Sequence, residues 1–194
     1  MPHSSEIRAR HVQTVLANID RLPEPTRAAV VSALGHAVAT SVEGATGLEW
    51  LPVEIDIALT HALHQGLGPS QFERFYRALF IEVFRGPVFR SFTQATRAVF
   101  GLDPAGWLRW LPEMWNVVFR NCGQWTVTPA GPGLATLILS DLPHASVVDD
   151  VWPTAVAAAL SATLDIAGMQ GGIDVVRVDA EQRQASFEMR WRDP

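Results

Sequence analysis

The sequence predicts an α+β fold in which about six helices pack against one C-terminal antiparallel sheet. Apolar residues recur at helical spacing as far as Phe119, and beyond Asn121 they alternate as in extended strands. The 194 residues are 48% hydrophobic and 18% charged, and a chain of this size can bury roughly 70% of its surface. We therefore expect a single domain over residues 1–194, with a helical N-terminal extension at 1–47 and a core at 48–192.

Three helices are predicted in the first third of the chain. Ser5 is a candidate cap for the first, and Pro23 ends it. A second helix is expected to start at Pro25, and a third to cover residues 53–65 before the glycines of Gly66-Leu67-Gly68.

The fourth predicted helix begins at Ser70 and has the clearest periodicity in the sequence. Its apolar residues fall at i, i+3, i+4, i+7, i+8, i+11 and i+12; they are Phe72, Phe75, Tyr76, Leu79, Phe80, Val83 and Phe84. A fifth helix is expected over residues 88–100. Asp103-Pro104 is typical of the start of a sixth, which Pro112 should kink or split.

The rest of the chain has the order β-β-α-β-β. The pattern predicts a hairpin from strands 124–128 and 134–139, and a helix over residues 151–169 that Gly171-Gly172 follows. Two further strands, 173–178 and 185–191, complete the sheet. The last alternates between apolar and polar residues, as an antiparallel strand with one solvated face requires.

Composition excludes several classes of function. All fifteen basic residues are Arg, so chemistry that needs a lysine, such as Schiff-base formation or P-loop phosphate binding, is not expected. A net charge of −5 disfavours nucleic acid as a partner. The single cysteine, Cys122, the absence of a signal peptide and the lack of a long apolar run predict a cytoplasmic protein without a transmembrane segment.

Few residues form a recognisable catalytic pattern. Glu54, His61 and His64 could share one flank of the third helix and bind a metal. Their spacing is more typical of the polar end of an amphipathic helix, so no metal site is predicted.

Cys122 is either a reactive thiol next to Arg120 or a buried filler. No nucleophile elbow and no phosphate-binding glycine loop is present. The balance leans against an enzyme.

Aromatic residues are dense between Phe72 and Trp125. They either fill the core or frame an apolar slot for a flat or long-chain ligand, whose carboxylate an arginine at the mouth (Arg85, Arg90, Arg109 or Arg120) could meet. On the second interpretation, the candidate ligand-binding residues are Phe75, Phe80, Phe84, Phe89, Trp107, Trp110, Trp115, His61, Arg120 and Cys122.

The sequence resembles the 4-vinyl reductase-like ligand-binding domains and a related myxobacterial paralogous family of unknown function. The matching elements are WLP at 50–52, FRSF at 89–92, NCG at 121–123 and the C-terminal hairpin IDVVRV…ASFEMRW. The resemblance covers residues 48–192 and lies in the order of elements more than in exact motifs.

This resemblance implies a fold related to haem nitric-oxide-binding domains and TRAPP-type subunits, which enclose an apolar ligand and often form homodimers. Two features depart from those families. The YxSxR haem signature is missing, because the only tyrosine is Tyr76, and Cys122 has no companion cysteine. No cofactor is expected on this basis; a haem with His61 as axial ligand, or a lipid-like ligand, stays open.

Three functions remain open at this point. The first is a cytoplasmic, homodimeric module that binds or senses a small apolar or amphipathic molecule. The second is a signalling or scaffolding adaptor with a solid core, and the third is an enzyme for a hydrophobic substrate that uses His61, His64 or Cys122.

Overall fold

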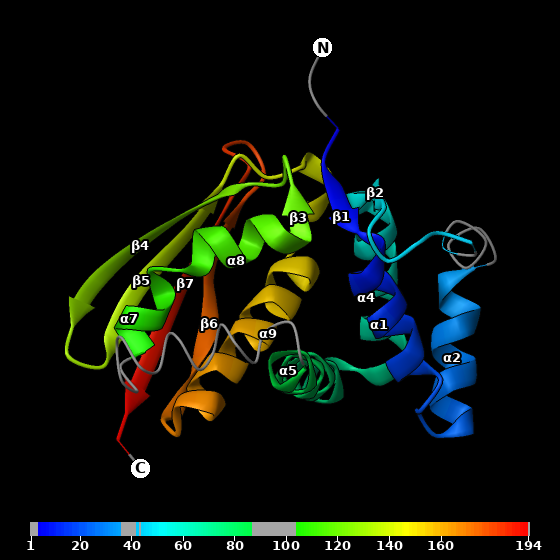
Figure 1. The fold of residues 1–194 in the computed structure, drawn as a ribbon, viewed down its shortest axis with the longest axis horizontal. Coiled ribbons are helices and arrows are strands. Elements are labelled where there is room, and N and C mark those ends of the chain that lie inside the picture. Colours follow the sequence, from blue (N-terminus) through cyan, green and yellow to red (C-terminus); the bar gives the residue numbers. More distant parts are fainter. Residues whose placement is uncertain (1–3, 36–41, 43, 87–103, 194) are drawn as a thin grey trace.

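The computed structural model describes residues 4–35, 42, 44–86 and 104–193. The predicted α+β class is confirmed, with the helices mainly in the N-terminal part and the large antiparallel sheet at the C-terminal end (Figure 1). Helix α9 lies between that sheet and the N-terminal helices in this view, and α5 packs against it.

The N-terminal helices form one side of the molecule. Helix α1 covers Ala9–Ile19 and α2 covers Glu24–Leu34, with Pro25 in its first turn. Helix α4 covers Val53–Leu67, and α5 covers Pro69–Arg85. Gly68 separates α4 from α5 at φ 72°, a left-handed conformation that glycine adopts without steric cost, and Pro69 then begins the next helix.

Two short helices follow the part of the chain from 87 to 103. Helix α7 covers Pro104–Leu108 and α8 covers Leu111–Val118. Pro112 lies in the first turn of α8, where its missing N–H is tolerated. The split that Pro112 predicted is therefore confirmed.

The large sheet has the strand order β4-β5-β7-β6, all antiparallel. Its strands are β4 (Gln124–Gly131), β5 (Leu134–Ser140), β6 (Gln170–Asp179) and β7 (Gln184–Arg192). Leu137 pairs with Phe187 at its centre, and both side chains are buried. The short turn η1 (His144–Ser146) and helix α9 (Val151–Ala167) connect β5 to β6.

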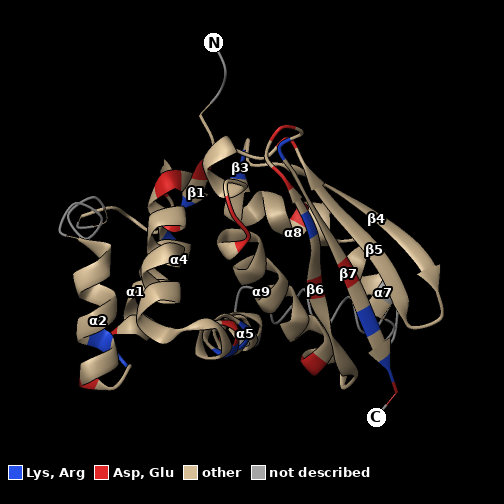
Figure 2. Ribbon diagram, turned by 180° about the vertical axis from the view of Figure 1, so that it is seen from behind, with Lys and Arg blue, Asp and Glu red and all other residues tan. Residues whose placement is uncertain are grey.

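Helix α9 is the central element of the core. It is rich in alanine, which allows close packing, and its one charged residue, Asp165, lies near its end. Figure 2 shows α9 in tan over most of its length, without charged residues there. The Arg77 guanidinium of α5 donates two hydrogen bonds to the Asp165 carboxylate, at 2.6 and 2.8 Å. The Ser161 hydroxyl accepts the backbone N–H of Ile173 at 2.9 Å, which fixes α9 to β6. These contacts hold α9 between α5 and the sheet.

A second sheet was not predicted. Strand β1 (Glu6–Arg8) lies between β2 (Trp50–Pro52) and β3 (Phe119–Arg120), antiparallel to both. The expectation that Ser5 caps a helix is wrong, because β1 precedes α1 and the Ser5 hydroxyl donates to the carbonyl of Asn121 at 2.6 Å. Through β1, the predicted N-terminal extension shares a sheet with residues of the predicted core.

The remaining element predictions differ little from the structure. Strands and helices from residue 124 onward match to within a few residues, and the predicted third and fourth helices correspond to α4 and α5. The helix predicted over 88–100 lies outside the described residues. Within the described part of the chain, no helix combines the length and apolar character needed to cross a bilayer.

Candidate functional site

A cavity lies between α1, α4, α5, α8 and α9. Its volume is about 80 Å³, and it opens partly to solvent. A single water needs roughly 10–15 Å³ of such volume, so the cavity has room for several waters. We call it the aromatic cavity.

Aromatic rings form its main wall. Trp115 and Phe119 stack with ring centroids 4.0 Å apart, and Trp152 meets both edge-on at 6.0 Å. Phe80 and Phe84, one turn apart on α5, line the cavity as well. The Trp115 indole N–H donates to the carbonyl of Cys122 at 2.8 Å. This bond fixes the ring that the others pack against.

Helix α9 supplies the aliphatic side of the cavity. The residues that line it are Ala155, Val156, Ala159 and Leu160. Alanine side chains at two of these positions leave space that larger residues would occupy. The cavity is therefore mostly apolar.

One end of the aromatic cavity is polar and centres on Asp56 of α4. Asp56 is 3% exposed, and its Oδ2 accepts a hydrogen bond from the Trp152 indole N–H at 2.9 Å. Its Oδ1 has no hydrogen-bond partner among the described residues. His11 Nε2 lies 3.5 Å from that oxygen, close enough for an ion-pair contact when the imidazole is protonated, without forming a hydrogen bond.

A neutral hydroxyl pair completes the polar end. The hydroxyls of Thr60 and Tyr76 lie 2.8 Å apart and share a hydrogen bond. Burial raises the pKa of Tyr76 well above its ordinary value, and the nearby Asp56 adds to the effect. Tyr76 therefore stays protonated at neutral pH, and Asp56 and His11 are the cavity-lining residues able to carry charge among those that the structure describes.

The structure places the predicted aromatic residues in several environments. Phe80, Phe84 and Trp115 line the cavity. Phe75 packs edge-on against Tyr76 at 5.7 Å, outside the lining. Trp107 is buried but does not line the cavity, and Trp110 is 39% exposed beyond the end of α7. Phe89 lies outside the described residues.

The predicted polar site residues lie away from the cavity. His61 Nε2 is 3.7 Å from the Asp149 carboxylate, near the surface. Arg120 pairs with Glu6 and lies over the ring of Trp50. Both side chains find these partners outside the core, so neither is available to a ligand in the cavity.

Other candidate arginines do not reach the cavity in the described part of the chain. Arg109 is exposed and is absent from the lining. Arg90 and the side chain of Arg85 lie outside what is described. The predicted arginine at the mouth is therefore not found among the described lining residues.

Cys122 is a buried residue whose thiol is not poised to react. Burial raises its pKa far above the ordinary value, and the carboxylates of Asp56 and Glu54 add to the shift. Nucleophilic cysteines need the thiolate. The structure therefore favours the interpretation as a buried filler.

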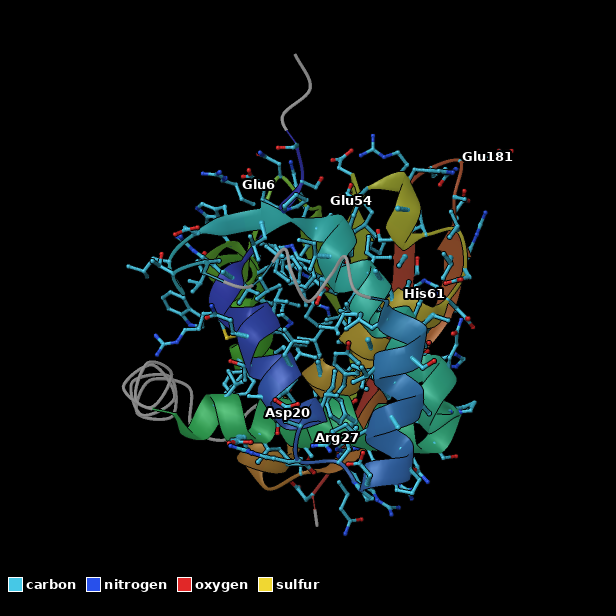
Figure 3. The ribbon with its side chains drawn as sticks, turned by 90° about the vertical axis from the view of Figure 1, so that its right-hand side faces the viewer. Glu6, Asp20, Arg27, Glu54, His61 and Glu181 are labelled. Carbon is cyan, nitrogen blue, oxygen red and sulfur yellow. The ribbon has the colours of Figure 1, made fainter. Side chains whose placement is uncertain are left out.

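Glu54, His61 and His64, which the sequence allowed as one flank of α4, are held in different surroundings. Figure 3 shows Glu54 near one end of α4 and His61 further along that helix. His64 packs edge-on against Phe72 at 5.1 Å. No group of three His, Cys, Asp or Glu able to hold a metal occurs among the described residues.

Sequence reasoning missed the polar end of the cavity. The spacing of Asp56 could have predicted its burial, because Thr60 and Leu63 lie four and seven residues after it on the buried face of α4. His11 directly precedes the buried Val12. An acid and an imidazole beside apolar stripes indicate buried polar groups, which are candidates for a site.

Comparison with known proteins shows a likeness in fold. No protein-family model matches the chain, and no curated protein matches. An H-NOX protein from K. algicida is 9% identical with a TM-score of 0.63, covering 97% of this chain and 98% of its own. An oxygen-binding H-NOX domain related to soluble guanylate cyclases is 9% identical with a TM-score of 0.60, covering 97% and 96%.

A third similar structure is a mutant of the T. tengcongensis H-NOX, 7% identical with a TM-score of 0.58 and coverage of 94% and 96%. Identities this low show the fold alone. The fold expected through haem nitric-oxide-binding domains is therefore confirmed, while the resemblance to 4-vinyl reductase-like domains stays a prediction.

The described lining fits a haem poorly, because it offers candidate axial ligands but no arginine for the propionates. Haem iron needs an axial His, Cys, Met or Tyr, and haem propionates are best met by arginine. Tyr76 is held protonated beside Thr60, His61 is outside the cavity, and Asp56 places negative charge in it. His11 and Met114 line the cavity, but no arginine does among the described residues.

Proposed function

We propose that this protein is a binding or sensing module that holds a small apolar or amphipathic molecule in the aromatic cavity. The observation that carries the proposal is the cavity itself, which is lined by the rings of Phe80 and Trp115 and by Trp152 and the alanines of α9. Its volume of about 80 Å³ has room for several waters, and it opens partly to solvent.

Burial of apolar surface would drive binding. Each methylene group contributes about 0.8 kcal/mol when it leaves water, so an eight-carbon chain gains about 6 kcal/mol before association costs are subtracted. The rings lose little conformational freedom on binding because they are already packed against one another. The site can therefore bind a ligand by shape and burial, without covalent chemistry.

The H-NOX likeness supports this proposal at the level of architecture. One structure of similar fold is an oxygen-binding domain, and a small-ligand binder with this architecture is consistent with the proposal. The poor fit to haem favours a lipid-like ligand in the present chain.

Titration with 1-octanol tests the proposal. We expect saturable 1:1 binding by calorimetry, together with a change in tryptophan fluorescence because Trp115 and Trp152 line the cavity. Organic extraction of freshly purified protein and mass spectrometry would identify a ligand acquired in the cell. The absence of saturable binding by any medium-chain probe would contradict the proposal.

A matched pair of variants locates the binding. Ala159→Leu fills the cavity, whereas Ala28→Leu adds the same atoms to an exposed position on α2. We expect Ala159→Leu to weaken 1-octanol binding at least tenfold and Ala28→Leu to leave it unchanged. Equal affinities in both variants would place the binding site elsewhere.

A further inference from the structure

We infer that the ligand of the aromatic cavity has a hydroxyl or amino head that donates a hydrogen bond to Asp56 Oδ1. The inference rests on the proposed function and extends it from an apolar ligand to a class of amphipathic ligand: alcohols and amines with an apolar body.

Asp56 carries a hydrogen-bond acceptor that no described residue uses. Asp56 is buried and lines the cavity, and its two oxygens differ. Oδ2 is occupied by the Trp152 indole N–H at 2.9 Å, whereas Oδ1 has no hydrogen bond within the described part of the chain. A buried carboxylate oxygen without a hydrogen bond is costly. A ligand that donates to it recovers that cost on binding.

The polar groups next to Asp56 form no hydrogen bond with Oδ1. The hydroxyls of Thr60 and Tyr76 are engaged with each other at 2.8 Å. His11 Nε2 stands 3.5 Å from Oδ1 without forming a hydrogen bond. None of these groups gives Asp56 Oδ1 a hydrogen bond. A ligand that brings a donor to the polar end of the cavity can therefore form one.

The charge of the Asp56 carboxylate disfavours an anionic ligand. A ligand carboxylate would meet the buried Asp56, and no arginine offsets that repulsion among the described lining residues. This differs from the arginine-bound carboxylate that the sequence suggested. The polarity of the cavity favours donors over anions.

The distribution of polar groups around the cavity indicates where the polar and apolar parts of the ligand would lie. The polar side chains Asp56, His11, Thr60 and Tyr76 come from α1, α4 and α5, while α8 and α9 contribute apolar lining. One polar end and one apolar body match an amphipathic molecule with its head at Asp56.

A series of probes with the same chain tests the head group. The probes are 1-octanol and octylamine as donors, 1-methoxyoctane as an acceptor without a donor, and octanoate as an anion. A hydrogen bond to a charged group is worth about tenfold to hundredfold in affinity. We expect both donors to bind at least tenfold tighter than 1-methoxyoctane and octanoate.

A substitution at Asp56 gives a second readout. In Asp56→Asn the amide oxygen must accept the Trp152 N–H, so the amide NH₂ replaces Oδ1 and turns an acceptor into a donor. We expect the preference for 1-octanol over 1-methoxyoctane to fall at least tenfold or to reverse. Asp174→Asn makes the same change on the exposed surface of β6 and should preserve the wild-type preference.

The outcomes separate this inference from the proposed function. If no probe binds, the cavity is not a ligand site and the proposed function fails. If all four probes bind with similar affinity, or octanoate binds tightest, the cavity holds ligands but Asp56 does not select the head. The probe series uses the wild-type protein, so the inference can be overturned even if Asp56→Asn does not fold.

Discussion

Asp56 and Trp152 form a buried hydrogen bond between side chains 96 residues apart in sequence. The bond joins α4 to the start of α9, and it satisfies one of the two carboxylate oxygens. Its loss would leave the Asp56 carboxylate buried without a hydrogen-bond donor among the described residues.

Trp152→Phe tests the strength of this contact. We expect the variant to lose about 1–3 kcal/mol of unfolding free energy, because an unsatisfied buried acceptor keeps its full desolvation cost. Urea unfolding measures the loss. Trp191→Phe, at a half-buried strand position, should cost less than about 1 kcal/mol, and equal losses in the two variants would contradict the role assigned to the bond.

The buried thiol of Cys122 makes stability depend on pH. Its pKa is raised in the folded state by burial, so above about pH 8.5 the unfolded chain releases a proton that the folded chain retains. Fewer bound protons in the unfolded state mean that stability falls as pH rises, by up to about 1.4 kcal/mol per pH unit.

Cys122→Ala should remove this contribution. Between about pH 8.5 and 10 we expect the unfolding free energy of the variant to fall less steeply than that of the wild type. Tyr76 also has a raised pKa, so it lowers the unfolding free energy in the same way near the ordinary tyrosine pKa of about 10. This contribution is the same in the wild type and in Cys122→Ala. Parallel pH profiles would show that the thiol is not buried as described.

At the scale of elements, α2 and α4 meet through an unusually close contact. A Cβ on Gly66 would lie 2.4 Å from Val30 Cγ2 and 3.0 Å from its backbone nitrogen. Glycine at this position lets the two helices approach, although it costs about 1 kcal/mol in helix propensity.

Gly66→Ala should therefore destabilise the protein by about 1–3 kcal/mol, in spite of its better helix propensity. Thermal or urea unfolding measures the effect. In a Val30→Ala background the nearest clash is removed, so the same substitution should cost clearly less. A stabilising effect of Gly66→Ala in the wild type would rule out the close contact.

The short sheet shows where sequence patterns stop being informative. Strands of two or three residues, such as β1 and β3, are too short to show alternation, and these two strands pair although they lie more than 100 positions apart. The long strands β5 and β7 have clear patterns because one face is buried, and they were predicted correctly. Periodicity identifies an element only when it is long enough to repeat.

At the scale of the whole molecule, the sequence indicated aromatic density but not its arrangement. Phe80, Phe84 and Trp115 were expected at a ligand slot and line the cavity. Phe119 and Trp152 pack into the same wall, yet α9 comes from a distant part of the chain and its contact with α4 leaves no local pattern. The polar end of the cavity was missed for the same reason, since Asp56 and His11 meet only in the folded chain.

Homodimer formation and a cytoplasmic location stay predictions of the sequence. Both concern the environment of the molecule. For its interior, we propose that the rings around α9 enclose a space that a ligand can fill.

The unfolding free energy of Ala159→Leu tests that claim most directly. Because the added side chain would enter the aromatic cavity, we predict that the variant gains about 0.5–2 kcal/mol relative to the wild type, while Ala28→Leu on the surface changes little. A loss of about 1–3 kcal/mol, as overpacking of a filled core produces, would show that the interior is solid and would contradict the account.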